Sequence, residues 1–146
     1  MTVDAGPKAQ VFSMKTPLLS EGRSNQEIAA TELLKLRMKV YAEGGENGLH
    51  RHIDEDHAFV ILQGQATFHD EEENLSVVNK YEGIMIPRGA AYYFTSTGDE
   101  NLVLLRVGAG RKPGSGFRLG PNGVPLTPEE NGHIEGVVIP GKFFGE

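Results

Sequence analysis

The sequence predicts an all-β fold in a single domain, built as an antiparallel sandwich or barrel. Short stretches in which apolar and polar residues alternate follow one another along most of the chain, separated by clusters of turn-forming residues. Glycine and proline account for 19 and 8 of the 146 residues, which favours short elements joined by turns over long helices. A chain of this length is expected to form one domain with a substantial core.

The alternation becomes regular after Thr31, where Leu34, Leu36, Met38 and Val40 are separated by lysine and arginine residues. This period of two indicates a strand with one buried side and one solvent-facing side. The glycine-rich residues 44–48 predict a loop. Shorter strands are then predicted over residues 49–52, 57–62, 65–69, 75–78, 83–86, 92–95 and 102–107. Some helical character is expected over residues 25–34.

Three regions are expected along the chain. Residues 1–30 form an N-terminal arm with room for one edge strand, residues 31–110 form the barrel, and residues 111–146 form a C-terminal extension. The extension is rich in glycine and proline but ends in apolar residues that include Phe143 and Phe144. We expect this apolar end to pack on the barrel or on a partner subunit, because exposing it to water is unfavourable.

The charge balance argues against several classes of partner. Lys+Arg 14 and Asp+Glu 20 give a net charge of −6, and no basic cluster is longer than Arg111-Lys112, so nucleic acid is not an expected partner. No apolar run has membrane length and no leader pattern follows Met1, so we expect a cytoplasmic protein without membrane contact. The lack of cysteine excludes disulfides, thiolate catalysis and cysteine-bound metal.

Three histidines fall in one short segment. His50 and His52 are one residue apart, so on a strand their side chains share a face and start about 7 Å apart. Residues 53–56 are expected to turn the chain back, so that His57 begins the antiparallel neighbour strand. One hairpin would then bring three imidazoles together, as a mononuclear metal site requires. The alternative is a set of exposed loop histidines beside an acidic turn.

The same segment resembles the first motif of the cupin family. That motif reads Gly, five residues, His-x-His, three or four residues, Glu, six residues, Gly. This chain has Gly44, His50, His52, His57 and Gly64 at the matching intervals, with His57 in the position of the glutamate. The match in spacing implies the cupin fold.

The second cupin motif is matched in part. Residues 87–89 read Pro-x-Gly as in the family, whereas Tyr81, Tyr92 and Ser96 stand in the positions of its glycine, histidine and asparagine. The resemblance covers about residues 31–110. It implies a single-domain cupin, which is a double-stranded β-helix or jelly-roll-like barrel, and it implies a homodimer.

The resemblance also implies one divalent metal ion, held by His50, His52 and His57. Iron, zinc, nickel and manganese all remain open, because imidazole accepts several of these ions. Three neutral ligands would leave the ion with nearly its full double charge, which favours anionic or enolisable oxygen ligands. His57 and Tyr92 are expected to be catalytic. Tyr92 either binds the ion as phenolate or, as we favour, donates a hydrogen bond and relays a proton, since phenol titrates near pH 10.

Alternation along the strands outlines a substrate pocket, because residues two apart share a face. Starting from His57 and Tyr92, and adding the strand over residues 34–40, we expect an apolar and partly aromatic lining. Its members are Met38, Phe59, Ile61, Tyr92 and Phe94. Such a lining suits a small, partly apolar organic molecule with an oxygen function. The alternative is that these residues only fill the core.

Several other polar residues are expected outside the site. They are His69, His133, Asp54, Glu55, Asp56, Arg88 and Arg106. The carboxylates are consecutive at a turn, so they should point in different directions into solvent. The two arginines are expected at strand ends or on the surface, unless the substrate is a carboxylate.

Three classes of function remain open, and the weakest is a storage or structural cupin, which the histidines disfavour. The leading hypothesis is a metal-dependent enzyme acting on a small molecule, through dioxygenase-like chemistry or as a Lewis-acid cyclase or isomerase of the polyketide cyclase kind. The rival is a non-catalytic, metal-containing cupin that binds small ligands.

Overall fold

The computed structural model describes residues 6–110, 118–126 and 134–146. Within these ranges the chain forms eleven β-strands and no α-helix, and therefore no helix that could cross a membrane. The strands are β1 (Thr16–Glu21), β2 (Arg23–Ala30), β3 (Leu34–Tyr41), β4 (Gly45–His50), β5 (Glu55–Gln63), β6 (Gln65–His69), β7 (Leu75–Asn79), β8 (Gly83–Ile86), β9 (Tyr92–Ser96), β10 (Leu102–Gly110) and β11 (Val137–Phe144).

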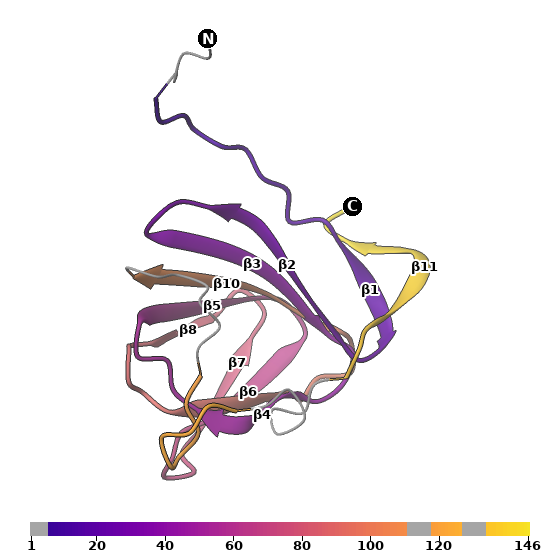
Figure 1. Ribbon diagram of the computed structural model, residues 1–146. Helices are drawn as coiled ribbons and strands as arrows, with labels where there is room; N and C mark the ends of the chain where they lie inside the picture. The colour runs from indigo at the N-terminus through magenta and orange to yellow at the C-terminus, as the bar shows by residue number, and fades with distance from the viewer. Residues whose placement is uncertain (1–5, 111–117, 127–133) are drawn as a thin grey trace.

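Two antiparallel sheets enclose the core (Figure 1). One has five strands in the order β2-β3-β10-β5-β8, and the other has four in the order β4-β9-β6-β7. This arrangement confirms the predicted all-β, single-domain barrel. The helical character expected over residues 25–34 is wrong. Those residues instead contain most of β2, whose backbone pairs with β3, because pairing with a neighbouring strand outweighs weak local propensity.

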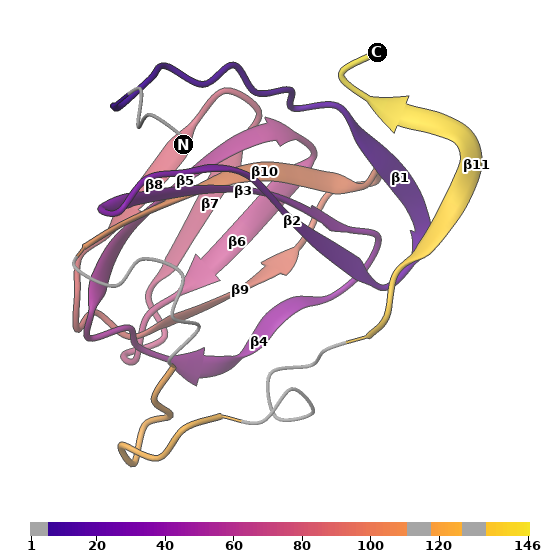
Figure 2. The ribbon, with the colours of Figure 1, turned by 45° about the horizontal axis from the view of Figure 1, so that its top comes forward.

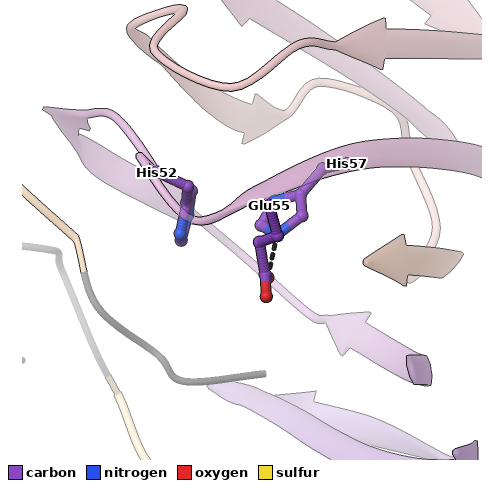
Figure 3. A group of neighbouring side chains, drawn as sticks. All are labelled: His52, Glu55 and His57. Carbon is purple, nitrogen blue, oxygen red and sulfur yellow. Dashed lines mark hydrogen bonds and ion pairs between the residues drawn. The ribbon is translucent and has the colours of Figure 1, made fainter. Parts of the chain in front are cut away.

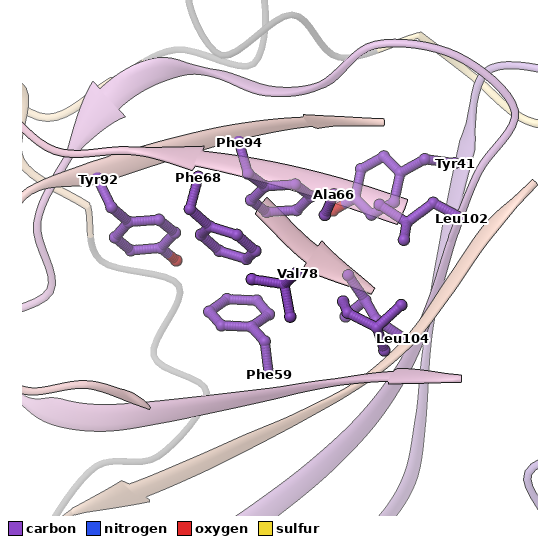
Figure 4. Packing of buried hydrophobic residues seen from close by; sticks show 10 residues of the cluster. Tyr41, Phe59, Ala66, Phe68, Val78, Tyr92, Phe94, Leu102 and Leu104 are labelled. Atoms are coloured by element: carbon purple, nitrogen blue, oxygen red, sulfur yellow. The ribbon is translucent and has the colours of Figure 1, made fainter. Parts of the chain in front are cut away.

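The core lies between the two sheets and is largely aromatic (Figure 4). Along β5, every second residue from Glu55 to Ile61 is buried and the residues between them are partly exposed. This alternation points Phe59 into the interior. From the opposite sheet, Phe68 and Phe94 stack with ring centroids 4.8 Å apart, and the Phe94 centroid lies 5.7 Å from that of Phe59. Aromatic contacts therefore join the two sheets.

The residues expected to line the pocket lie in two separate buried clusters. Phe59, Ile61, Tyr92 and Phe94 all belong to the buried cluster between the sheets. Met38 does not, because it packs with Leu19 of β1 on the outer face of β3. The inner face of β3 carries Lys39 and Tyr41 instead, and Lys39 pairs with Glu46 of the opposite sheet. The prediction of Met38 in the pocket is therefore wrong.

A separate two-stranded ribbon is formed by β1 and β11 (Figure 2). The two strands are antiparallel, and Thr16 is the register partner of Phe144. Asn101 ties β1 to the barrel through two hydrogen bonds. Its Nδ2 donates to the carbonyl of Leu19 at 3.0 Å, and its Oδ1 accepts from the N–H of Leu19 at 2.7 Å. The end of the C-terminal extension therefore pairs with the N-terminal part of the same chain, and this ribbon covers the outer face of β3.

We expect the substitution Phe59→Ala to lower the free energy of unfolding by about 3–5 kcal/mol, because removing a buried ring leaves a cavity. Phe59 is 0% exposed. Urea denaturation of the variant and the wild type measures this loss, and Phe59→Leu, which keeps much of the volume, should lose less. A loss below about 1 kcal/mol for Phe59→Ala would contradict a packed core at this position and favour an open pocket.

Candidate metal centre

Three buried side chains converge where β5 begins (Figure 3). One nitrogen each from His52 and His57 and one carboxylate oxygen from Glu55 lie within 4.8 Å of one another, as a group that could hold a metal ion. His52 lies in the link that follows β4, whereas Glu55 and His57 are the first and third residues of β5. Two imidazoles and one carboxylate form a donor set that both zinc and non-haem iron(II) accept.

The local sequence explains this convergence. Glu55 and His57 are two residues apart on a strand, so both point into the barrel. On the neighbouring strand β10, Gly108 is the register partner of His57. A Cβ atom at Gly108 would lie 3.1 Å from Oε1 of Glu55 and 3.5 Å from Cδ2 of His57. The glycine therefore leaves the space that the two side chains occupy.

Glu55 and His57 are in direct contact. Nε2–H of His57 donates a hydrogen bond to Oε1 of Glu55, whereas Nδ1 of His57 is buried without a hydrogen-bond partner among the described residues. The ring centroid of His52 lies 4.3 Å from that of His57. A hydrogen bond thus joins two groups that can both bind cations, and a ring nitrogen beside them lacks a partner. These residues fit a divalent ion.

Burial keeps the imidazoles in the form that binds metal. Loss of hydration, with smaller contributions from His57 and His50, lowers the pKa of His52 to about 2. Burial also lowers the pKa of His57, against the opposing effect of its hydrogen bond to Glu55. A neutral imidazole keeps the lone pair that a metal ligand needs. His52 therefore has no proton to lose at neutral pH before it can bind an ion.

The sequence model of the cupin domain matches residues 37–108, which include all three of these side chains. The chain belongs to the cupin superfamily. Among solved structures, a double-stranded β-helix protein from Klebsiella pneumoniae subsp. pneumoniae matches 78% of this cupin and 95% of its own chain, with a TM-score of 0.64 and 15% identity. KdgF from Halomonas sp. matches 60% of this cupin and 79% of its own chain, with a TM-score of 0.54 and 16% identity.

An oxalate oxidase in complex with the substrate analogue glycolate has a similar structure. It matches 64% of this cupin with a TM-score of 0.54 and 19% identity. This cupin spans only 54% of the length of that oxidase chain. None of the curated proteins compared with this cupin matches its sequence. At these identities, the likeness to solved structures shows a shared fold.

His50 lies beside the group of converging donors but is not part of it. It is the last residue of β4, and its ring centroid lies 5.2 Å from that of His52. Its Nδ1–H donates to the carbonyl of Gly48 at 2.7 Å, and its Nε2 lies 3.5 Å from Oε2 of Glu46. The structure therefore brings together two of the three predicted histidines, with Glu55 where we expected His50.

The predicted hairpin between His50 and His57 does not exist, because the two residues lie on different sheets. Strand β4 pairs with β9, whereas β5 pairs with β10 and β8. The link over residues 51–54 therefore passes from one sheet to the other. His52 and His57 approach each other through this crossing.

Glu55 is the site residue that sequence interpretation missed. We expected it to be solvated together with Asp54 and Asp56, but it is only 2% exposed. Counting back by two along the strand from His57 identifies it, because that step keeps the same face. Its carboxylate also overturns the expectation of an all-neutral ligand set. An ion bound here would have one anionic ligand.

Tyr92 is close to the group and stays protonated. It is the register partner of His50, and its ring centroid lies 4.4 Å from that of His50 and 6.2 Å from that of His52. Its hydroxyl is buried without a hydrogen-bond partner among the described residues. Burial raises the pKa of Tyr92 well above its usual value, and the carboxylate of Glu46 raises it further. A neutral phenol is a hydrogen-bond donor, and this favours the relay role over ligation as phenolate.

The sequence has two further histidines, His69 and His133. His69 stacks on Tyr93 with ring centroids 4.2 Å apart, and its Nδ1 lies 3.6 Å from Oε2 of Glu73. Neither contact involves a member of the donor group. His133 lies outside the described residues.

We expect Glu55→Gln to weaken binding of a divalent ion by about 10–100-fold or more, since even changes to groups that only support a ligand reach this size. Titration with zinc against a chromophoric chelator measures the affinity. Asp54→Asn is the matched control, because it removes a partly exposed carboxylate one residue away and should leave the affinity unchanged. Equal affinity in Glu55→Gln and the wild type would remove Glu55 from the site.

The substitution Gly108→Ala should also weaken metal binding while leaving the folded state intact. Its Cβ atom would lie 3.1 Å from Oε1 of Glu55, so the flexible carboxylate has to move while the backbone can stay in place. Metal affinity and the midpoint of urea denaturation, measured on the same preparation, separate the two effects. Unchanged affinity would mean that the position of this carboxylate does not matter for the ion.

Proposed function

We propose that this cupin is a metal-dependent enzyme that holds one divalent ion through His52, Glu55 and His57 and acts on a small, oxygen-bearing organic molecule. One observation carries the proposal: these three donors converge within 4.8 Å while buried. A carboxylate and two imidazoles lose hydration free energy when they are buried, whereas apolar side chains at the same positions would not. A bound cation would offset part of this cost. A contribution to folding stability therefore does not by itself explain why these three side chains are buried together.

The number of protein donors supports catalysis over a structural role. Structural zinc sites are closed by four protein ligands, whereas catalytic sites use three and keep a position for water or substrate. The donor group here has three members among the described residues. A bound divalent ion would act as a Lewis acid that polarises a substrate oxygen, or, if it is iron, would support oxygen chemistry.

The residues around the group would position the substrate and handle protons. The hydroxyl of Tyr92 holds its proton at neutral pH, because burial raises its pKa, and it can donate that proton or a hydrogen bond to a substrate oxygen. The rings of Phe59 and Phe68 pack against Tyr92, with centroids 5.7 and 6.1 Å away. These rings exclude water from one side of the site, which strengthens polar interactions within it.

Metal analysis of the purified protein, followed by turnover assays with diketones and phenols, tests the proposal. We expect about one divalent ion per chain, lost on chelation together with activity and poorly retained by Glu55→Gln. Iron with oxygen uptake would assign an oxygenase, and zinc or nickel with product but no oxygen uptake would assign a cyclase or isomerase.

Two outcomes would contradict the proposal. A protein that binds no divalent ion after reconstitution would remove the metal site. A protein that retains both metal and a small ligand but forms no product would instead be a non-catalytic binding cupin.

A further inference from the structure

A second feature of the molecule is a cavity that adjoins the candidate metal centre and is lined in part by the exposed residue Asn25. Its volume is about 80 Å³, and His52 of the metal centre forms part of its wall. The other lining residues are Asn25, Arg37, Lys39, Glu46, Arg106 and Arg118. Four of these are cations and one is a carboxylate, so the wall carries an excess of positive charge. The chain as a whole has a net charge of −6, so this excess is local.

The single carboxylate of the wall already has partners. Oε1 of Glu46 accepts hydrogen bonds from Nζ of Lys39 and, at 3.3 Å, from the hydroxyl of Tyr41. The positive charge of Lys39 also lowers the pKa of Glu46 well below its usual value. Lys39 and Glu46 therefore form an ion pair at neutral pH. Within the wall of the cavity the charges of the three arginines remain in excess over this pair, and the carboxylates of Glu27 and Glu55 act on Arg37 from outside the wall.

The three arginines line the same cavity, and two of them have a nitrogen without a hydrogen-bond partner among the described residues. Arg37 of β3 and Arg106 of β10 are direct register partners, and like charges opposite each other across two strands are destabilising. Arg106 is only 8% exposed, and its Nε has no hydrogen-bond partner in the described part of the chain. Nη1 of Arg118 is likewise buried without one. Guanidinium stays charged at all accessible pH values, so it cannot reduce this cost by losing its proton.

We propose that Arg106, together with Arg37 and Arg118, binds the oxyanion of a small organic substrate, a carboxylate or a phosphate group. This inference rests on the proposed function, because the adjoining metal centre would take a second oxygen of the same molecule. The planar fork of a guanidinium matches both oxyanions with two parallel hydrogen bonds. Arg106 lies in the middle of β10 and is only 8% exposed, so the expectation that it is an ordinary strand-end or surface residue is wrong.

Space for the rest of the molecule adjoins this cavity. A second cavity of about 180 Å³ shares Asn25, Lys39, Glu46 and Arg118 with the first. Its other lining residues are Arg23, Ser24 and Tyr41. Polar and charged residues line both cavities, in contrast to the apolar lining expected from alternation. The subsite therefore favours a substrate that carries an anionic group, and the phenylalanine rings between the sheets serve as core.

Binding of inorganic phosphate and of succinate, measured by calorimetry at constant ionic strength in sodium chloride, tests the subsite. The wild type is expected to bind at least one probe, and the comparison of the two distinguishes phosphate from carboxylate. Arg106→Gln should weaken binding about 10–100-fold, the loss expected for hydrogen bonds to a charged group. Arg106→Lys should be intermediate, because it keeps the charge but not the fork.

Arg88→Gln is the matched control, since it removes an arginine charge from a side chain that is 60% exposed, and it should bind as the wild type does. Without a probe, Arg106→Gln should melt at the same or a higher temperature, because a buried charge whose Nε–H lacks an acceptor is gone. Arg118→Gln should weaken binding as well. Arg118 lies outside β10, the strand that carries Arg106. A folding defect in one of the two variants therefore does not prevent the test with the other.

The proposal is overturned if neither probe binds the wild type, or if Arg106→Gln and Arg118→Gln bind as tightly as Arg88→Gln. Each titration is run on the protein as purified and after chelation, with metal content measured in parallel. Loss of metal binding alone would refute the proposed function and leave the oxyanion result standing. Loss of oxyanion binding with metal retained would refute only the subsite.

Discussion

The alternation of side chains along β5 is the constraint on which both the core and the candidate site depend. Every second residue of the strand faces the barrel interior, and these positions hold Glu55, His57, Phe59 and Ile61 in turn. The first two carry donor atoms and the last two carry apolar bulk. One strand therefore supplies a polar end and an apolar end to the same interior without any change in backbone geometry.

This arrangement couples the packing of the core to the electrostatics of the site. Phe59 lies directly behind His57, with ring centroids 6.0 Å apart, and Phe59 also packs against Tyr92. These rings remove water from the neighbouring imidazoles and phenol. The same burial lowers the pKa of His57 and raises that of Tyr92. Close packing thus sets the protonation states that a metal centre with a proton donor requires.

Patterns in the local sequence predicted the features that depend only on alternation within one strand. They failed for features that depend on contact with a distant segment of the chain. The strands predicted at β3 and β5 were correct, and the first cupin motif located His52 and His57. The solvent-facing side predicted for β3 was wrong in its second half, because both faces are buried from Met38 to Tyr41. Alternation also shows that Lys39 and Met38 lie on opposite faces of β3, but not which face is inside. That choice is made by β1 and β11, which cover Met38 from outside, and no local pattern reveals this contact.

The same distinction explains the errors at the site. The hairpin was inferred from a turn between neighbouring segments, but β4 finds its partner in β9, more than forty residues later along the chain. Glu55 was misjudged for a different reason. A run of acidic residues usually indicates a solvated turn, and this composition obscured the fact that the strand starts at Glu55 and that its face is shared with His57. Here the strand period was informative, and composition was misleading.

The candidate metal centre and the cationic cavity would together act on one bound molecule, as proposed above. His52 belongs to both, so the two sites meet at a single side chain. A ligand that places one oxygen at the donor group and an oxyanion at Arg106 is held at two points, which fixes its direction along the barrel interior. A neutral ligand would gain only the first contact and would leave Nε of Arg106 and Nη1 of Arg118 without an acceptor. Selectivity for an anion would then come as much from the cost of leaving these two buried N–H groups without a partner as from the contacts that the anion makes.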